Sequence, residues 1–228
     1  MRQVILDTET TGLSPQQGHR IIEIGCVEMI NRRLTGREFH HYLQPDRKID
    51  PGATHVHGIT NDQLKGKPRF KQIAEDLKIF LKGAELIIHN ATFDIGFIEN
   101  EFALIKDEQW ENVEDHCEVT DTLSLARKKH PGQRNNLDAL CKRYNVSLEH
   151  RTKHGALLDA QILSQVYLAM TGGQNTLVLE DKDIVMQEKS HASLIAPVME
   201  IIDLCVIKPT EEEMLEHLAF EKTLGGTA

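Results

Sequence analysis

The sequence predicts an α/β domain with a central mixed sheet of five strands flanked by helices. Three strand-like segments come first in the chain, and strand-like and helix-like segments alternate after them. Consecutive strands favour antiparallel pairing, whereas strands separated by helices favour parallel pairing. Both patterns in one domain indicate a mixed sheet.

Strands are expected where short apolar runs stand between turn-forming residues. The first strand contains the apolar run Val4-Ile5-Leu6, and Asn31-Arg32-Arg33 is expected to form a tight turn between the second and third strands. Asp50-Pro51-Gly52 is expected to lie in a loop. The strands are predicted at residues 2–9, 19–30, 34–43, 85–89 and 118–121.

Helical periodicity and terminal signals predict the remaining elements. An amphipathic helix is expected to end at Gly83, because glycine commonly follows a helix. Asn90 is expected to cap the next helix, which reaches about Lys106. Helical segments are predicted at residues 61–65, 69–82, 91–106, 122–129, 135–144 and 155–170.

The chain is predicted to have three parts. Residues 1–173 form the α/β domain, residues 174–200 form a linker, and residues 201–228 form a C-terminal segment with a small helix capped by Thr210. The chain has 228 residues, of which 40% are hydrophobic, and no apolar run is long enough for a membrane span. No secretory signal is recognised, and the four cysteines are scattered, so we expect a cytoplasmic protein with reduced thiols.

The net charge of −9 is unevenly distributed. Residues 1–174 contain 22 Lys/Arg and 24 Asp/Glu, whereas residues 175–228 contain 4 and 11. A protein that binds nucleic acid without the help of a partner usually carries an excess of basic residues. We therefore expect weak intrinsic affinity for nucleic acid, with a partner that delivers the domain and an acidic tail that binds protein.

Four carboxylates stand where apolar core residues are expected. Asp7 and Glu9 share one face of the first strand, because residues two apart in a strand point the same way. Asp94 and Asp159 lie on apolar helical stripes. A buried cluster of carboxylates repels itself, and Mg²⁺ or Mn²⁺ relieves that repulsion. The pattern favours a metal-dependent phosphoryl-transfer site.

Each feature alone has a simpler explanation. An isolated Asp-x-Glu is common on surfaces, and His40, His41, His116 and His130 are interpreted as structural. Two basic clusters either contact phosphate or are solvated helix ends; they are residues 127–130 and the group Arg134, Lys142 and Arg143. The three motifs in one chain, at residues 5–13, 88–97 and 154–160, favour function over coincidence.

Over residues 1–172 these motifs make the sequence similar to the 3′→5′ exonucleases with an Asp-Glu-Asp-Asp signature, in the subclass with a histidine five residues before the last aspartate. The resemblance implies an RNase H-like fold, two divalent ions and release of 5′-mononucleotides. It implies that Asp7 bridges both ions, that Glu9 and Asp159 complete one ion site, and that Asp94 supports the other. His154, in a loop before the last helix, is expected to be the general base.

The resemblance also implies a pocket for the terminal nucleotide. Gly12 is expected to permit close approach of that nucleotide, and Leu13 to wedge against its base. Most of these assignments rest on resemblance, and either a turn or the core would also explain Gly12 and Phe93. The pocket residues are Thr10, Thr11, Gly12, Leu13, His57, Asn90 and Phe93.

Among these exonucleases, the likeness is greatest to proofreading subunits of bacterial replicative polymerases. Gln174, Leu177 and Leu179 resemble a short sliding-clamp motif, although the strongest versions end in an aromatic residue and an ordinary linker is the alternative. Residues 201–228 are expected to dock on the polymerase subunit, and a small accessory subunit is a further candidate partner.

The expected substrate is a single-stranded or frayed DNA 3′ end. Two alternatives remain open from the sequence. One is a free-standing exonuclease that trims RNA or oligonucleotides, and the other is a replisome adaptor with a vestigial site.

Overall fold

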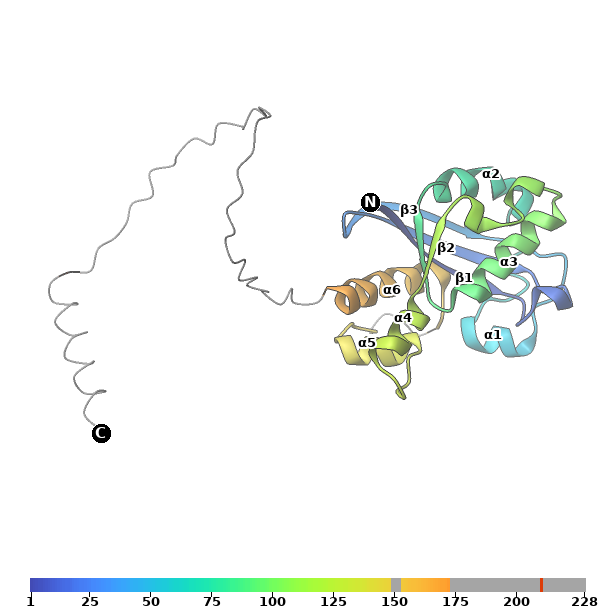
Figure 1. Ribbon diagram of the computed structural model, residues 1–228. Helices are drawn as coiled ribbons and strands as arrows, with labels where there is room; N and C mark the ends of the chain where they lie inside the picture. Colours follow the sequence, from blue (N-terminus) through green and yellow to red (C-terminus); the bar gives the residue numbers. More distant parts are fainter. Residues whose placement is uncertain (149–152, 173–209, 211–228) are drawn as a thin grey trace, which may run out of the picture. The chain divides into compact units, whose positions relative to one another are not determined.

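The computed structural model describes residues 1–148, 153–172 and 210. In this part of the chain, five strands form one sheet in the order β3-β2-β1-β4-β5, with β1 at its centre (Figure 1). β1 pairs antiparallel with β2 and parallel with β4, so the predicted mixed α/β sheet is confirmed. The strands are β1 (Arg2–Thr10), β2 (Ile21–Ile30), β3 (Arg33–Tyr42), β4 (Glu85–Ile88) and β5 (Glu118–Asp121).

The predictions for the tail concern a different part of the chain. The linker, the clamp motif and all of the C-terminal segment except Thr210 lie outside the described residues. Apart from Thr210, the structure therefore bears on residues of the α/β domain alone.

The predicted tight turn joins β2 to β3. Asn31 and Arg32 have φ angles of 50° and 64°, which places both in the left-handed region. Two such residues in succession match the twist of an antiparallel hairpin. β2 therefore runs to Ile30, and β3 begins at Arg33.

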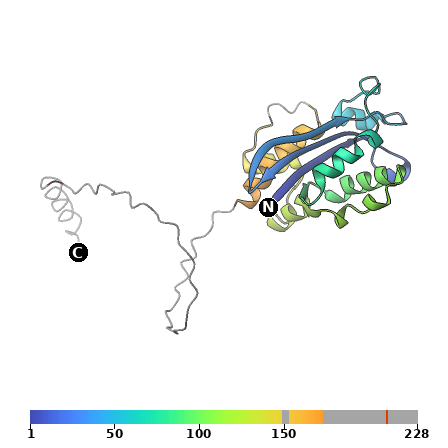
Figure 2. The same cartoon turned by 90° about the horizontal axis from the view of Figure 1, so that it is seen from above.

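Helices cover both faces of the sheet (Figures 1 and 2). None of the described helices is long and apolar enough to cross a membrane. The described residues include 3₁₀ segments at Pro15–Gln17, Glu108–Trp110 and Val113–Asp115. The α-helices are α1 (Pro51–His57), α2 (Phe70–Leu81), α3 (Ala91–Leu104), α4 (Thr122–Lys129), α5 (Leu137–Tyr144) and α6 (Ala156–Thr171).

Alternate residues of β1 supply two separate cores. Leu6 packs in the cluster that contains Leu77 of α2 and Phe102 of α3. Ile5 packs in the cluster that contains Leu163 of α6, on the opposite face. Because side chains alternate along a strand, odd-numbered residues of β1 face α6. α5 packs against α6 through a third cluster that includes Leu140.

The prediction of a loop at Asp50-Pro51-Gly52 is wrong, because these residues begin α1. Pro51 occupies the first helical position, where its fixed φ suits the helix and its missing N–H costs nothing. Gly58, with a φ of 75°, ends the helix. The Asp-Pro pair is common to turns and to helix starts, and a seven-residue helix is too short to show clear periodicity.

Asn90 is the N-cap residue of α3, as predicted, but the capping hydrogen bond expected from its side chain is absent. The φ of Asn90 is 69°, in the left-handed region. Its backbone N–H instead donates to Oδ1 of Asp121, at 3.0 Å. This bond ties the start of α3 to the end of β5.

Candidate active site

The carboxylates of β1 lie at its C-terminal end. Asp7 and Glu9 share the face of Ile5, which packs against α6, and both are partly buried. Thr8 lies between them and points toward α2 and α3. The first predicted pair of acids therefore faces the N-terminal turn of α6.

A glycine on the neighbouring strand lets α6 approach. Gly25 is the partner of Asp7 in the β1–β2 register. A Cβ atom on Gly25 would stand 2.1 Å from the backbone nitrogen of Leu157. The first turn of α6, which carries Asp159, therefore rests directly on the sheet beside Asp7.

Three of the five predicted catalytic residues form one cluster. Glu9, His154 and Asp159 each present a ligand atom, and these atoms all lie within 4.8 Å of one another. Nδ1 of His154 is 3.0 Å from Oδ2 of Asp159. Asp159 is 3% exposed, whereas the His154 side chain is 43% exposed. As expected, His154 precedes the helix, and its backbone N–H donates to the carbonyl of Val56.

Asp94 occupies the other side of β1. It is buried in the first turn of α3, and its Oδ1 accepts hydrogen bonds from Thr8, at 3.0 Å from the backbone nitrogen and 2.6 Å from Oγ1. Burial raises the pKa of the Asp94 carboxyl to about 7, against the lowering effect of the bonds from Thr8. An ionised Asp94 is therefore costly in the absence of a positive charge.

The buried thiol of Cys26 lies near two of the acids. Burial raises the pKa of Cys26, and the negative charges of Asp7 and Asp94 raise it further. The carboxylates of Asp7 on β1 and Asp94 on α3 are therefore both close enough to Cys26 to influence its thiol. Among the described residues, the compact cluster excludes Asp7 and Asp94, so a second ion position at these two residues stays a prediction.

The donor set fits divalent metal ions. Carboxylate oxygens are the ligands that Mg²⁺ and Mn²⁺ prefer, and a cation offsets both the mutual repulsion of the acids and the desolvation of Asp94. The ligand atoms of Glu9, His154 and Asp159, which lie within 4.8 Å of one another, provide the clearest position. The geometry supports a candidate metal site at the end of β1.

A cavity of about 540 Å³ lies beside this cluster, between β1, α1 and α3. Leu13 is 85% exposed at its wall, which leaves an apolar side chain available to a ligand. Nε2 of His57 is buried and has no hydrogen-bond partner among the described residues. The predicted pocket residues that line the cavity are Thr10, Gly12, Leu13, His57 and Phe93.

Two predicted pocket residues lie elsewhere. Thr11 is buried, and its Oγ1 lies 3.0 Å from Nδ1 of His19 and accepts the backbone N–H of Arg20. Asn90 lines a different cavity, beside α4. Gly12 does line the pocket, but a Cβ atom there would stand 2.1 Å from the ring of His19. Packing within the protein is therefore enough to require glycine at that position.

Comparison with known sequences identifies the family. Residues 4–167 match the exonuclease family RNase_T. The chain belongs to this exonuclease family. It is 50% identical to DNA polymerase III subunit epsilon of Escherichia coli over 222 residues, which cover 96% of this chain and 91% of the relative. The subunit epsilon of Haemophilus influenzae is 48% identical over 233 residues, which cover 98% of this chain and 90% of the relative.

Solved exonuclease structures share the fold. Exonuclease X in complex with 5′-overhanging duplex DNA has a TM-score of 0.57 at 24% identity, covering 75% of this chain and 91% of that one. The zinc-bound complex of Escherichia coli exonuclease I with single-stranded DNA has a TM-score of 0.63 at 20% identity, covering 74% and 40%. The predicted resemblance, the RNase H-like fold and the nuclease class are confirmed.

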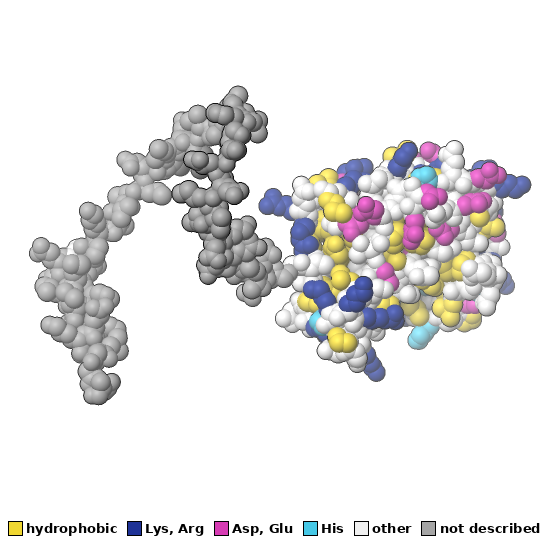
Figure 3. All heavy atoms as spheres, viewed as in Figure 1, with side chains coloured by type: hydrophobic (Ala, Val, Ile, Leu, Met, Phe, Trp, Pro, Cys, Tyr) yellow, Lys and Arg dark blue, Asp and Glu magenta, His cyan; other side chains and the backbone are white. Residues whose placement is uncertain are grey.

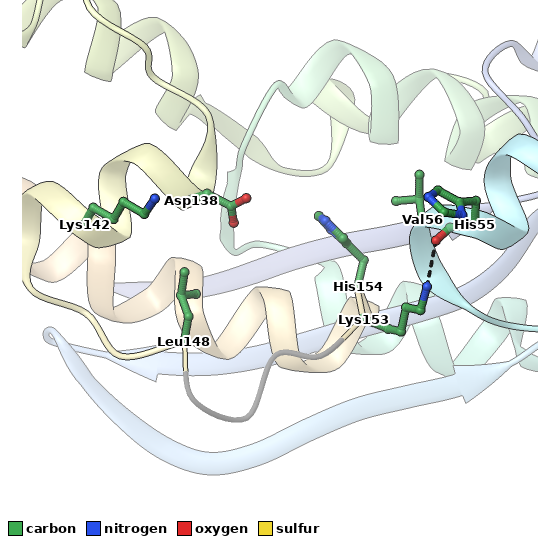
Figure 4. Close-up of a pocket in the computed structure, with 7 residues that line it drawn as sticks. All are labelled: His55, Val56, Asp138, Lys142, Leu148, Lys153 and His154. Atoms are coloured by element: carbon green, nitrogen blue, oxygen red, sulfur yellow. Dashed lines mark hydrogen bonds between the residues drawn. The ribbon is translucent and has the colours of Figure 1, made fainter.

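A second cavity of the exonuclease, of about 480 Å³, adjoins His154 (Figure 4). Figure 4 shows the imidazole projecting between Asp138 on α5 and Val56 on α1. Lys153 is held at the rim by a 3.0 Å hydrogen bond from its Nζ to the carbonyl of His55. His154, whose side chain is 43% exposed, is therefore accessible through this cavity.

The sequence analysis did not identify Glu23 as a buried acid beside the site. Glu23 is the partner of Glu9 in the β1–β2 register. Glu23 is 2% exposed, and its Oε1 is 2.8 Å from Nε2 of His40, which supports the structural interpretation of that histidine. Its Oε2 has no hydrogen-bond partner among the described residues. The signal was available, because Glu23 interrupts an apolar strand as Asp7 does.

Proposed function

We propose that this exonuclease is the proofreading subunit, epsilon, of a bacterial DNA polymerase III. In this proposal it removes 5′-mononucleotides from single-stranded or frayed DNA 3′ ends. The observation that carries the proposal is the cluster of Glu9, His154 and Asp159 beside an open, partly apolar cavity. The polymerase assignment rests on about 50% identity, over nearly the whole chain, to proteins of that name.

Asp7, Glu9, Asp94 and Asp159 are the proposed ligands of two divalent ions, Mg²⁺ or Mn²⁺. Bound ions of this kind stabilise the charge that develops on the attacking and leaving oxygens of an in-line displacement. The chain's own contribution is to fix the carboxylates: β1 holds one pair, and the first turns of α3 and α6 hold the others. The bonds from Thr8 fix the orientation of Asp94.

His154 is the proposed general base. Its Nδ1 faces Oδ2 of Asp159 at 3.0 Å, which favours the tautomer with the proton on Nδ1. Nε2 is then the nitrogen that accepts a proton from the attacking water. The position of His154 before α6, with a half-exposed side chain, allows it to reach a water molecule beside Glu9.

The cavity beside Leu13 is the proposed site of the terminal nucleotide. Leu13 and Phe93 offer apolar surface to a base, and the buried Nε2 of His57 offers a polar contact. A nucleotide must leave the duplex to enter, so a mismatched end, which is already unpaired, is favoured. This selectivity is what proofreading requires.

Three partners are proposed from the sequence of the tail and from the named relatives. The alpha subunit of polymerase III binds residues 201–228, the sliding clamp binds residues 174–179, and a small accessory subunit is a further candidate. Tethering replaces intrinsic DNA affinity with effective concentration, which suits a domain without a net basic charge.

A mispaired primer assay with Mn²⁺ tests the exonuclease, and co-purification with the replicative polymerase tests the partnership. We expect removal of the mispaired 3′ nucleotide and loss of that activity in Asp7→Ala. Activity unchanged in Asp7→Ala would contradict the site and revive the adaptor with a vestigial site. Faster cleavage of RNA than of single-stranded DNA of equal length, without co-purification, would favour the free-standing enzyme.

Clamp binding has its own test in the full chain. Gln174→Ala combined with Leu177→Ala is expected to abolish a pull-down of the sliding clamp, and Leu179→Ala is expected to weaken it. The mispaired primer assay without the clamp serves as the control and should not change. Clamp retention by the double variant would remove this part of the proposal.

A further inference from the structure

Positive charge is concentrated in one part of the exonuclease domain. Residues 122–148 contain six Lys/Arg and one carboxylate, whereas residues 1–121 contain 14 Lys/Arg and 21 Asp/Glu. The space-filling view shows dark blue side chains gathered over α4 and α5 (Figure 3). The basic residues are Arg127, Lys128, Lys129, Arg134, Lys142 and Arg143.

Some cations of the domain are paired with described acids, whereas those of α4 are not. Arg20, for example, pairs with buried Glu101 at 2.6 Å, and Lys78 pairs with Asp107 at 2.7 Å. Arg127, Lys128 and Lys129 are exposed and form no ion pair with any described residue. Their charge is therefore not neutralised within the described part of the protein.

A polar cavity of about 750 Å³ adjoins this charge. No carboxylate of the described residues lines it, and its lining residues include Asn90, Arg127, Gln133 and Asn136, which carry amide and guanidinium groups. Such groups donate hydrogen bonds to phosphate oxygens. The cavity therefore has the chemistry of a phosphate-binding surface.

The sheet topology places this cavity beside the catalytic cluster. β4 and β5 run parallel to β1, so their C-terminal ends share an edge with Glu9. Oδ1 of Asp121 accepts the backbone N–H groups of Asn90 and Leu123, at 3.0 and 2.9 Å, and so joins the starts of α3 and α4. The start of α4, the helix that carries Arg127, therefore lies at the same edge of the sheet as Glu9.

One turn of α3 separates the polar cavity beside α4 from the nucleotide cavity beside Leu13. Phe93 lines the nucleotide cavity, whereas Asn90 lines the polar cavity. The backbone N–H of Phe93 donates to the carbonyl of Asn90 at 3.0 Å, so the two residues bound a single turn. A helical turn rises about 5.4 Å, and Asp94 follows directly. A strand that leaves the nucleotide cavity across this turn meets Asn90 and then Arg127.

We propose that the polar cavity and the basic face of α4 bind the sugar-phosphate backbone of single-stranded DNA on the 5′ side of the scissile bond. This inference rests on the proposed function, because it requires the terminal nucleotide to lie beside Leu13. The face supplies local affinity in a domain whose other residues carry excess negative charge. It contacts phosphates rather than bases, so it binds without regard to sequence.

The test compares two substrates in the full chain: a DNA dinucleotide, which is too short to reach α4, and a twelve-nucleotide single strand. The variant is Arg127→Gln with Lys128→Gln. The matched control is Lys71→Gln with Lys82→Gln, which makes the same charge change at exposed positions on and after α2. We expect KM for the longer strand to rise at least fivefold in the α4 variant and to stay unchanged in the control.

Salt dependence supplies a second readout. For single strands, each lost phosphate contact reduces the steepness of the fall of log affinity with log salt by about 0.7. Two lost contacts should therefore reduce it by about 1.4. Dinucleotide hydrolysis should be unchanged, which also shows that the variant is folded. An unchanged KM and salt slope for the longer strand would overturn the proposal, as would an equal loss on the dinucleotide. A lower KM would overturn it too and would indicate an acidic protein segment on this face.

Failure of the proposed function has a different signature. If the unmodified chain hydrolyses neither substrate with Mn²⁺, the exonuclease assignment is wrong. If it hydrolyses both, and the α4 variant behaves as the control does, only the backbone-binding face is wrong.

Discussion

Gly25 of β2 and Leu157 of α6 are in direct backbone contact. A Cβ atom on Gly25 would stand 2.1 Å from the nitrogen of Leu157. Gly25 is also the partner of Asp7 in the sheet, and Asp159 lies two residues beyond Leu157. The absence of one side chain therefore sets the distance between the acids of β1 and the acid of α6.

Gly25→Ala is expected to separate these acids. The added methyl must displace the first turn of α6, which costs about 1–3 kcal/mol of unfolding free energy. A displacement of about 1 Å at a catalytic group can reduce turnover about 100-fold. We expect a loss of that size in kcat, measured on a single-stranded oligonucleotide, in protein that still unfolds cooperatively.

Gly96→Ala is the matched control, since a Cβ atom at this helical position meets nothing within 4 Å. It should leave kcat unchanged and should stabilise α3 by up to about 1 kcal/mol. Retention of kcat within twofold by Gly25→Ala would show that the close contact does not set the catalytic geometry.

The sequence predicted the sheet well because its central strands β1, β2 and β4 contain apolar runs and turn-forming residues stand between strands. Asn31 and the glycines marked the ends of elements correctly, and Gly83 does follow α2. α1 was missed because it has only seven residues and begins with an Asp-Pro pair that also starts turns. Short helices held by tertiary contacts leave little periodicity to detect.

The site was predictable to a similar degree. Carboxylates in apolar surroundings pointed to Asp7, Asp94 and Asp159; the structure buries Asp94 and Asp159 and leaves Asp7 partly buried, and their roles stay predictions. The contact of Gly25 with α6 and the pairing of Glu23 with Glu9 depend on the β1–β2 register, which the sequence does not specify. Phe93 and Asn90 line different cavities because one turn of α3 separates them, and no pattern in the sequence predicts this.

The raised pKa of Asp94 makes stability depend on pH. The carboxyl has a pKa of about 7 in the folded protein and 3.8 in the unfolded reference. Between these values the native state keeps a proton that the unfolded chain has lost, so unfolding free energy falls as pH rises. The contribution is complete below pH 3.8 and is lost by about pH 7. The loss is on the order of a few kcal/mol.

Denaturant unfolding in EDTA between pH 4 and 8 measures this effect. Asp94→Asn mimics the neutral carboxyl, so its stability should fall less over this range, while exposed Asp76→Asn should follow the unmodified chain. Mn²⁺ at pH 8 should stabilise the unmodified chain more than Asp94→Asn. Parallel pH profiles for all three proteins would contradict the buried, ionisable role of Asp94.

His154→Ala separates proton transfer from metal binding. The His154 side chain is 43% exposed, so its removal should change stability little. Loss of a general base reduces turnover by about 10²–10⁴-fold. Calorimetric titration with Mn²⁺ should give affinity within about threefold of the unmodified chain, because the proposed ligands are carboxylates.

His41→Ala is the control for a histidine outside the site. His41 lies on β3 and packs edge-on against Phe39, with ring centroids 4.7 Å apart. It should retain full turnover. Equal loss of turnover and of Mn²⁺ affinity in His154→Ala would identify His154 as a metal ligand, as its position in the cluster with Glu9 and Asp159 would also allow.

Leu13→Ala tests the apolar wall of the nucleotide cavity. Leu13 is 85% exposed, so truncation should change the unfolding free energy by less than about 0.5 kcal/mol. Loss of a base contact worth about 1–3 kcal/mol should raise KM for a single strand about fivefold or more. Leu104→Ala, at a leucine that is 55% exposed at the far end of α3, should leave KM unchanged. Equal KM values for both variants would show that Leu13 does not contact the terminal nucleotide.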